Sequence, residues 1–177
     1  MLDKAEEQQL RDIIARQQIH DLHCDYMRAQ DRLIPELHRS VFFDDATTDY
    51  GDAYRGGPDG FVAFAQGVLR PHLANHHMIG QAKIEVEGDV AFGEVYFQAH
   101  HRIVENGEEE DLFVAGRYVD RYEKRAGTWK IAHRSELVDW IRREPRADAG
   151  LQGEHRFPWG SRAPDDLSCQ REKLRRL

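Results

Sequence analysis

The sequence predicts an α+β fold, because its helical patterns precede its strand patterns. No proline or glycine occurs between Asp3 and Gln30, where helix-forming residues dominate. From Lys83 onward, apolar and polar residues alternate in segments separated by turn sequences such as Asn106-Gly107. Helices and strands segregated in this way are typical of one antiparallel sheet packed on helices, so alternating βαβ units are not expected.

Three helices are expected in the first half of the chain. The first runs from Asp3 to about Gln30 and is amphipathic, with apolar residues at helical spacing: Leu10, Ile13, Ile14, Ile19, Leu22 and Tyr26. The second begins at Pro35, a residue favoured in a first turn, and ends at Asp44-Asp45. The third follows a Gly-Gly-Pro-Asp loop and extends to Pro71.

The strand predictions begin with a short strand and turn from Ala46 to Tyr54. Strict alternation in Lys83–Glu87, closed by Gly88-Asp89, indicates a hairpin. Three further strands are expected at about Val90–Val104, Asp111–Lys124 and Thr128–Trp140. These segments together predict an antiparallel meander.

The chain length of 177 residues is enough for one domain with one core. We assign that domain to residues 1–145. Residues 146–177 are rich in Gly, Pro, Arg and Asp, which predicts a loop-like extension with Phe157 and Trp159 as anchors. This extension could cover a pocket or a neighbouring subunit.

The charge and apolar patterns argue against several classes of partner. A net charge of −7 provides no basic footprint for nucleic acid. No run approaches the roughly 18 apolar residues of a membrane span, and the charged N-terminus does not fit a secretory signal. Cys24 and Cys169 lie far apart, which favours free thiols over a disulfide or zinc site. We therefore expect a cytoplasmic protein.

Three segments carry a resemblance to a known family: Phe42–Ala46, Asn75–Asp89 and Gly116–Arg134. In order and spacing they resemble SnoaL-like proteins of the nuclear transport factor two-like superfamily, over most of residues 5–145. The resemblance is strongest to the branch of scytalone dehydratase, lindane dehydrochlorinase and bile acid 7α-dehydratase. It implies a cone-shaped α+β barrel, in which three helices pack into the concavity of a strongly bent sheet around an apolar cavity. It also implies a homo-oligomer, with a trimer preferred over a dimer.

The resemblance places a catalytic pair at His77 and Asp31. A neutral imidazole can take a proton from carbon near neutral pH, and the related dehydratases use a histidine at this position as base. Asp31 would fix the tautomer of that ring and stabilise the imidazolium that forms. On a strand, His76 would point to the opposite face, so it is interpreted as a bystander.

Further polar candidates surround this pair. Tyr26 would donate a hydrogen bond to an oxyanion or leaving hydroxyl, although about 140° of helix rotation separates it from Asp31; a core tyrosine is the alternative. Tyr50 resembles a tyrosine of scytalone dehydratase, and Thr48 shares its face by alternation. Arg134 resembles an arginine of lindane dehydrochlorinase and could pair with Asp31, stabilise a leaving anion, or form a structural ion pair.

Strand alternation also points one more histidine inward, since His101 shares a face with apolar residues and His100 does not. Apolar residues are assigned to the core or the substrate pocket: Phe61, Phe64, Val68, Phe97, Phe113 and Val114. His20 and His23 could nominally hold a metal, but no third ligand has a suitable spacing. With no phosphate loop or dinucleotide motif either, no metal or other cofactor is expected.

These features predict a cofactor-independent lyase for an apolar, ring-containing small molecule. His77 would remove a proton while Asp31 orients it, and Tyr26 or Tyr50 would assist the leaving group. A ketosteroid isomerase-like enzyme is the enzymatic alternative, although no carboxylate base can be placed from the sequence. A non-catalytic subunit, like the small subunit of ring-hydroxylating dioxygenases, is the other alternative.

Overall fold

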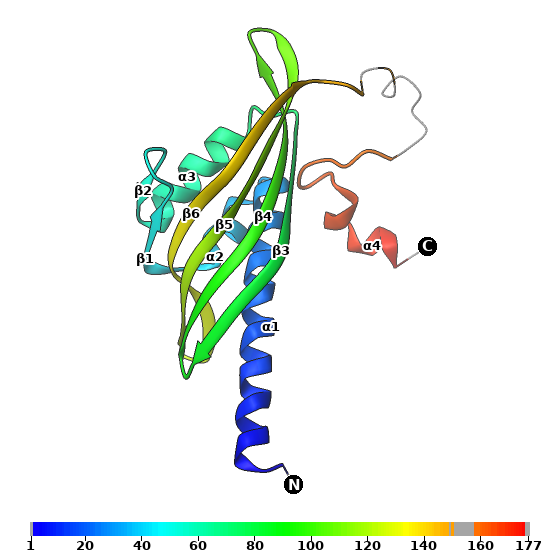
Figure 1. Ribbon diagram of the computed structural model, residues 1–177. Coiled ribbons are helices and arrows are strands. Elements are labelled where there is room, and N and C mark those ends of the chain that lie inside the picture. Colours follow the sequence, from blue (N-terminus) through cyan, green and yellow to red (C-terminus); the bar gives the residue numbers. More distant parts are fainter. Residues whose placement is uncertain (1, 149, 151–157, 176–177) are drawn as a thin grey trace.

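A computed structural model describes residues 2–148, 150 and 158–175 of the chain. Its helices and strands follow one another in the order that Figure 1 shows. The first half contains α1 (Lys4–Asp31), α2 (Pro35–Ser40), β1 (Phe42–Asp49), β2 (Arg55–Gly56) and α3 (Pro58–Leu69). The second half contains β3 (Ala74–Glu87), β4 (Val90–Glu105), β5 (Glu108–Arg125), β6 (Thr128–Pro145), a 3-10 turn at Leu167–Cys169 and α4 (Arg171–Leu174). The α+β prediction is confirmed.

One six-stranded sheet in the order β2-β1-β6-β5-β4-β3 forms the body of the domain. All neighbouring pairs are antiparallel except β1 and β6, which are parallel. The register shifts between Ile79 and Ala82 on β3 and at two places between β5 and β6. Such irregularities increase local twist and bending, and the sheet curves around the helices in Figure 1.

The first helix is fixed at its start by a capping box, in which Asp3 accepts from the backbone of Glu6 and Glu6 accepts from Asp3. Its N-terminal turns project beyond the strands (Figure 1), and the helix packs on the sheet from about Ala15 onward. Leu10, Ile13 and Ile14 are consequently exposed, so the predicted apolar stripe is buried only from Ala15 onward.

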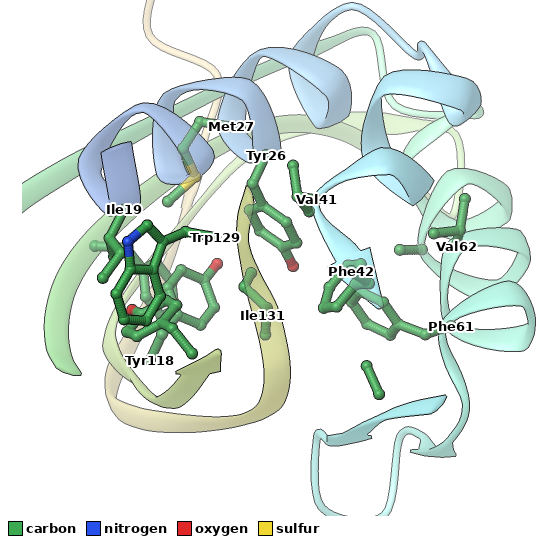
Figure 2. Packing of buried hydrophobic residues seen from close by; sticks show 14 of the residues in the cluster. Ile19, Tyr26, Met27, Val41, Phe42, Phe61, Val62, Tyr118, Trp129 and Ile131 are labelled. Carbon is green, nitrogen blue, oxygen red and sulfur yellow. The ribbon is translucent and has the colours of Figure 1, made fainter. Parts of the chain in front are cut away.

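Aromatic and aliphatic side chains fill the space between the sheet and the helices. Figure 2 shows Tyr26 of α1 pointing between Ile131 of β6 and the Val41-Phe42 pair, with Phe61 of α3 beyond. These side chains are at most 2% exposed, and burying each large one stabilises the fold by about 1.5–3 kcal/mol. Because α1, α3 and the sheet meet here, the core also sets the position of the cavity.

Two predicted boundaries were wrong. The second helix ends at Ser40 rather than at Asp45. The backbone of Val41 and Phe42 pairs with Ile131 of β6, so β1 begins at Phe42. The strand predicted to start at Lys83 begins at Ala74. Its register shift after Ile79 interrupts the alternation, which hides the first half of the strand from a periodicity search.

The chain beyond β6 returns to the helices. Ala163 donates to the carbonyl of Arg32, Arg162 donates to the carbonyl of Leu69, and Arg28 donates to Ser168. These contacts hold the C-terminal segment against the ends of α1 and α3. Trp159, an expected anchor, is 56% exposed, and Phe157 lies outside the described residues. Across the described ranges, every helix is too short or too polar to cross a membrane.

Candidate active site

A cavity of about 150 Å³ lies between α1, α3 and the concave face of the sheet. An empty space of this size can hold one benzene-sized ring. Most of its wall is apolar or aromatic, and a few polar side chains converge on it. Its lining residues are Tyr26, Gln30, Tyr50, Phe61, Phe64, Ala65, Val68, Leu69, His77, Phe97, Ala99, His101, Val114, Tyr118 and Glu136.

The His77 ring is held by Asp31. Nδ1 of His77 lies 2.6 Å from Oδ1 of Asp31, and the backbone N–H of His77 donates to both carboxylate oxygens at 3.0 and 3.1 Å. The two side chains are 5% and 13% exposed. Because a carboxylate only accepts hydrogen bonds, Nδ1 carries the proton and Nε2 keeps a lone pair. Nε2 makes no hydrogen bond with the described residues.

Strand pairing explains why His77 faces the cavity and His76 does not. His77 is opposite Ala99 of β4, another lining residue, whereas the exposed His76 is opposite His100. Asp31 is the last residue of α1 and lies behind the imidazole rather than in the cavity wall. Tyr26 lines the cavity directly, so the 140° rotation between Tyr26 and Asp31 is accommodated without a break in the helix.

The two predicted tyrosines form a pair. The hydroxyl oxygens of Tyr26 and Tyr50 lie 2.7 Å apart, and the Tyr50 ring stacks on Phe61. Burial raises the pKa of Tyr26 to about 12, although the guanidinium of Arg134 opposes this shift. Burial also raises the pKa of Tyr50 well above its ordinary value. Both phenols therefore stay neutral at physiological pH and can donate one hydrogen bond into the cavity.

The buried Arg134 belongs to a structural network rather than to the cavity wall. Its guanidinium pairs with Asp120 at 2.6 and 2.9 Å and donates to Nδ1 of His23 at 3.2 Å. His23 then donates through Nε2 to Tyr122, whose hydroxyl donates to Asp120. Burial, followed by the charge of Arg134, lowers the pKa of His23 well below its ordinary value. The predicted structural ion pair is thus formed with Asp120, not with Asp31.

The same guanidinium nevertheless touches the site through aromatic rings. Its carbon lies 4.2 Å from the ring centre of Tyr26 and 4.1 Å from that of Tyr118. Both rings line the cavity. A cation at this distance is attracted to the ring face, so Arg134 fixes these two phenols in place.

His101 faces the cavity as alternation predicts, and His100 lies on the other face against Phe113. Nδ1 of His101 lies 2.9 Å from Oδ1 of Asn75. Burial lowers the pKa of His101 to about 3, with the nearby His77 as the second cause. His101 is therefore a neutral ring beside the base, with its centre 5.0 Å from that of His77.

Five of the six predicted apolar residues line the cavity: Phe61, Phe64, Val68, Phe97 and Val114. Phe113 does not, because it is opposite the outward His100 and contacts Trp140 on the convex face. Val114, its neighbour on the strand, takes that place. Thr48 is also outside the wall, since its hydroxyl donates to the carbonyl of Gly56.

Three polar cavity residues were not predicted from the sequence: Gln30, Tyr118 and Glu136. Gln30 is buried on α1, one residue before Asp31. Tyr118 and Glu136 are paired across β5 and β6, so both side chains point to the concave face. Burial raises the pKa of Glu136 to about 7, against the opposing charge of Arg134. The signal was present in the sequence, because Glu136 is two residues after the inward Arg134 on the same strand.

The chain has relatives among dehydrochlorinases. It is 28% identical over 132 residues to γ-hexachlorocyclohexane dehydrochlorinase of Sphingobium indicum, a match covering 73% of this chain and 83% of that protein. The crystal structure of the type 2 hexachlorocyclohexane dehydrochlorinase LinA superposes with a TM-score of 0.70 at 25% identity, covering 86% of this chain and 99% of the other. A scytalone dehydratase candidate of Novosphingobium aromaticivorans shares the fold, with a TM-score of 0.67 at 18% identity, covering 86% and 95%. Residues 11–135 match the SnoaL-like domain, and the chain belongs to this family.

Proposed function

We propose that the protein is a cofactor-independent lyase that eliminates a small leaving group from an apolar, ring-containing substrate. The observation that carries this proposal is the short contact between Asp31 and Nδ1 of His77, which leaves the opposite ring nitrogen as a proton acceptor at an apolar cavity. Nε2 takes a proton from ring carbon, the C–H electron pair becomes the new double bond, and the leaving group departs from the next carbon.

Asp31 supports this step in two ways. It holds the ring in the tautomer that exposes the lone pair, and its negative charge stabilises the imidazolium formed after proton transfer. The contacts from both carboxylate oxygens to the backbone N–H of His77 fix the carboxylate itself. The base and its support are therefore organised before substrate binds, which lowers the entropic part of the barrier.

The tyrosine pair supplies neutral hydrogen bonding. One of the Tyr26 and Tyr50 protons is used between the two oxygens, and the other is available to a carbonyl or leaving group of the substrate. Arg134 reaches this region through the faces of the Tyr26 and Tyr118 rings. A developing negative charge is thus met by hydrogen-bond donors that are already oriented toward the cavity.

The cavity indicates the substrate class. Its volume of about 150 Å³ and its aromatic wall fit one six-membered ring. The related enzyme of Sphingobium indicum is a dehydrochlorinase of hexachlorocyclohexane, which is itself a six-membered ring. We take a single carbocyclic ring as the part of the substrate that enters the cavity.

Proton exchange at carbon tests the base directly. Cyclohexanone in D₂O should exchange its α-protons faster with the protein than without it, as followed by NMR. His77→Gln should abolish this acceleration, and His76→Gln is the matched control on the exposed face of the same strand. Full exchange by the His77 variant, or none by the wild type, would contradict the proposed base.

A ketosteroid isomerase-like reaction is the second candidate. Such a reaction needs a carboxylate base, and the sequence alone indicated no residue for this role. Glu136 lines the same cavity as His77 and could return a proton to another carbon. The products distinguish the two reactions, since elimination lowers the mass of the substrate and isomerisation preserves it.

A purely structural subunit has no need of the Asp31–His77 pair, and co-purification with an oxygenase large subunit would favour that alternative.

A further inference from the structure

Glu136 is a cavity residue whose carboxyl group has no evident role in stabilising the fold. It lies on β6 opposite Tyr118 and shares the cavity wall with His77. Its side chain makes no hydrogen bond or ion pair with the described residues, unlike the Asp31 and Asp120 carboxylates, which are both bound. A polar group at an apolar wall is costly without a partner, so the position is suited to a group that meets the substrate.

The surroundings of Glu136 favour its neutral, protonated form. Burial raises its pKa to about 7, and the opposing influence of Arg134 is weakened because that guanidinium is paired with Asp120. The other polar groups of the cavity wall are hydroxyl, amide or imidazole groups, from Tyr26 and Gln30 on α1, Tyr50, Tyr118 on β5, His77 on β3 and His101 on β4. Within this wall there is no lysine or arginine to hold the carboxyl group ionised.

Leaving groups differ in whether they need a proton from the protein as they depart. Chloride leaves as a stable anion and needs no proton, whereas hydroxide is a poor leaving group unless it is protonated as it departs. Tyr26, with its pKa raised to about 12, is a weak acid for this task. An acid whose pKa is near the working pH transfers its proton far more effectively. An acid in this cavity therefore has a use in dehydration that it lacks in dehydrochlorination.

We propose that Glu136 is the general acid of this site and that the substrate is a ring alcohol that loses water. The inference rests on the proposed lyase function and names its leaving group. His77 Nε2 takes the ring proton, the C–H pair forms the double bond, and the C–O pair leaves on oxygen, which accepts the Glu136 proton. The products are an alkene, water, imidazolium and glutamate, and proton transfer through solvent restores both side chains.

Two probes that give the same product separate the leaving groups. β-Hydroxycyclohexanone loses water and β-chlorocyclohexanone loses HCl, and both form cyclohexenone, which is measured by its ultraviolet absorbance above the uncatalysed rate. Glu136→Gln should slow water loss about 10²- to 10⁴-fold, the usual contribution of a general acid. Its effect on HCl loss and on the deuterium exchange of cyclohexanone should be much smaller, because neither step needs a proton donor for a leaving group. Glu144→Gln, on the exposed end of the same strand, is the matched control.

The pH dependence adds a signature that a structural role would not produce. In the wild type, kcat/KM for water loss should fall above about pH 7 as Glu136 ionises. That alkaline limb should be absent for HCl loss and absent from the residual water loss of Glu136→Gln. An equal loss of both eliminations in the variant, or unchanged water loss, would overturn the acid role. Loss of exchange in the wild type itself would instead count against the proposed function.

A measurement on the wild type covers the case in which the variant fails to fold or neither probe turns over. In protein labelled with ¹³C at the glutamate carboxyl carbons, the most alkaline titration should have its midpoint near pH 7. Its assignment follows from its disappearance in Glu136→Gln, or from its response to cyclohexanone when that variant does not fold. If every glutamate titrates near the ordinary value of 4.5, Glu136 is not the acid.

Discussion

Replacing Asp31 with asparagine should remove the base activity while preserving the shape of the site. The amide oxygen of the new side chain can still accept the backbone N–H of His77, which now donates at 3.0 and 3.1 Å to the two carboxylate oxygens. The substitution removes the 2.6 Å hydrogen bond that Nδ1 of His77 donates to Oδ1. An amide nitrogen there donates rather than accepts, so the ring is driven to the tautomer with its proton on Nε2, at the cavity.

These contacts set the expected effects of Asp31→Asn on stability and on turnover. Loss of one charge-assisted hydrogen bond should lower the free energy of unfolding by about 1.5–3 kcal/mol. The effect on turnover should be much larger, because the wrong tautomer has no lone pair where the substrate proton lies. A comparable inversion behind a catalytic histidine costs about 10⁴-fold in kcat.

Deuterium exchange of cyclohexanone provides the assay, with urea unfolding as the measure of stability. Asp25→Asn is the control, because Asp25 is an exposed carboxylate on the same helix whose side chain takes part in no hydrogen bond or ion pair with the described residues. Exchange by Asp31→Asn within about tenfold of the wild type, a difference of only about 1.4 kcal/mol in the barrier, would refute this role of Asp31. An equal loss of activity in Asp25→Asn would refute it as well.

Two further predictions concern stability. Asp120→Asn should lower the free energy of unfolding by about 3–5 kcal/mol, because it leaves the fully buried Arg134 uncompensated; urea denaturation measures this, and a loss below about 1 kcal/mol would contradict a buried pair. Burial lowers the pKa of His38 to about 3, so below pH 6.5 only the unfolded chain binds that proton. As pH drops from 6.5 toward 3, His38 alone should lower the free energy of unfolding by up to about 1.4 kcal/mol per pH unit. His38→Gln should reduce that slope and the exposed His20→Gln should not, as urea midpoints across this range would show; equal slopes in all three proteins would refute the assignment.

The fold was predictable from the sequence because its elements carry strong local signals. The capping residues and the absence of proline and glycine define α1, and the turn sequences Gly88-Asp89, Asn106-Gly107 and Ala126-Gly127 separate β3 to β6. The errors fall where tertiary pairing overrides local pattern. The Val41-Phe42 segment has a helical apolar spacing, yet its backbone pairs with β6.

The candidate site was predictable in part for the same reason. Alternation on β3 and β4 correctly directs His77 and His101 inward, because those stretches keep their register around the two histidines. Apolar character alone did not distinguish Phe113 from its cavity-lining neighbour Val114, since the convex face of this sheet also carries large apolar side chains such as Trp140. Glu136 was missed because a charged side chain on a strand is ordinarily assigned to the solvated face, although alternation with the inward Arg134 places it on the concave face.

The distribution of charge around the cavity favours binding of a neutral substrate. Arg134 is paired with Asp120, and the rings of Tyr26 and Tyr118 lie between its guanidinium and the cavity. Asp31 is screened from the cavity by the His77 ring. A charged ligand would find no counter-charge among the described lining residues other than Glu136, whose raised pKa favours the neutral acid. Charge develops only during proton transfer, at His77 and at the departing group, and these are the places where Asp31 and Glu136 lie.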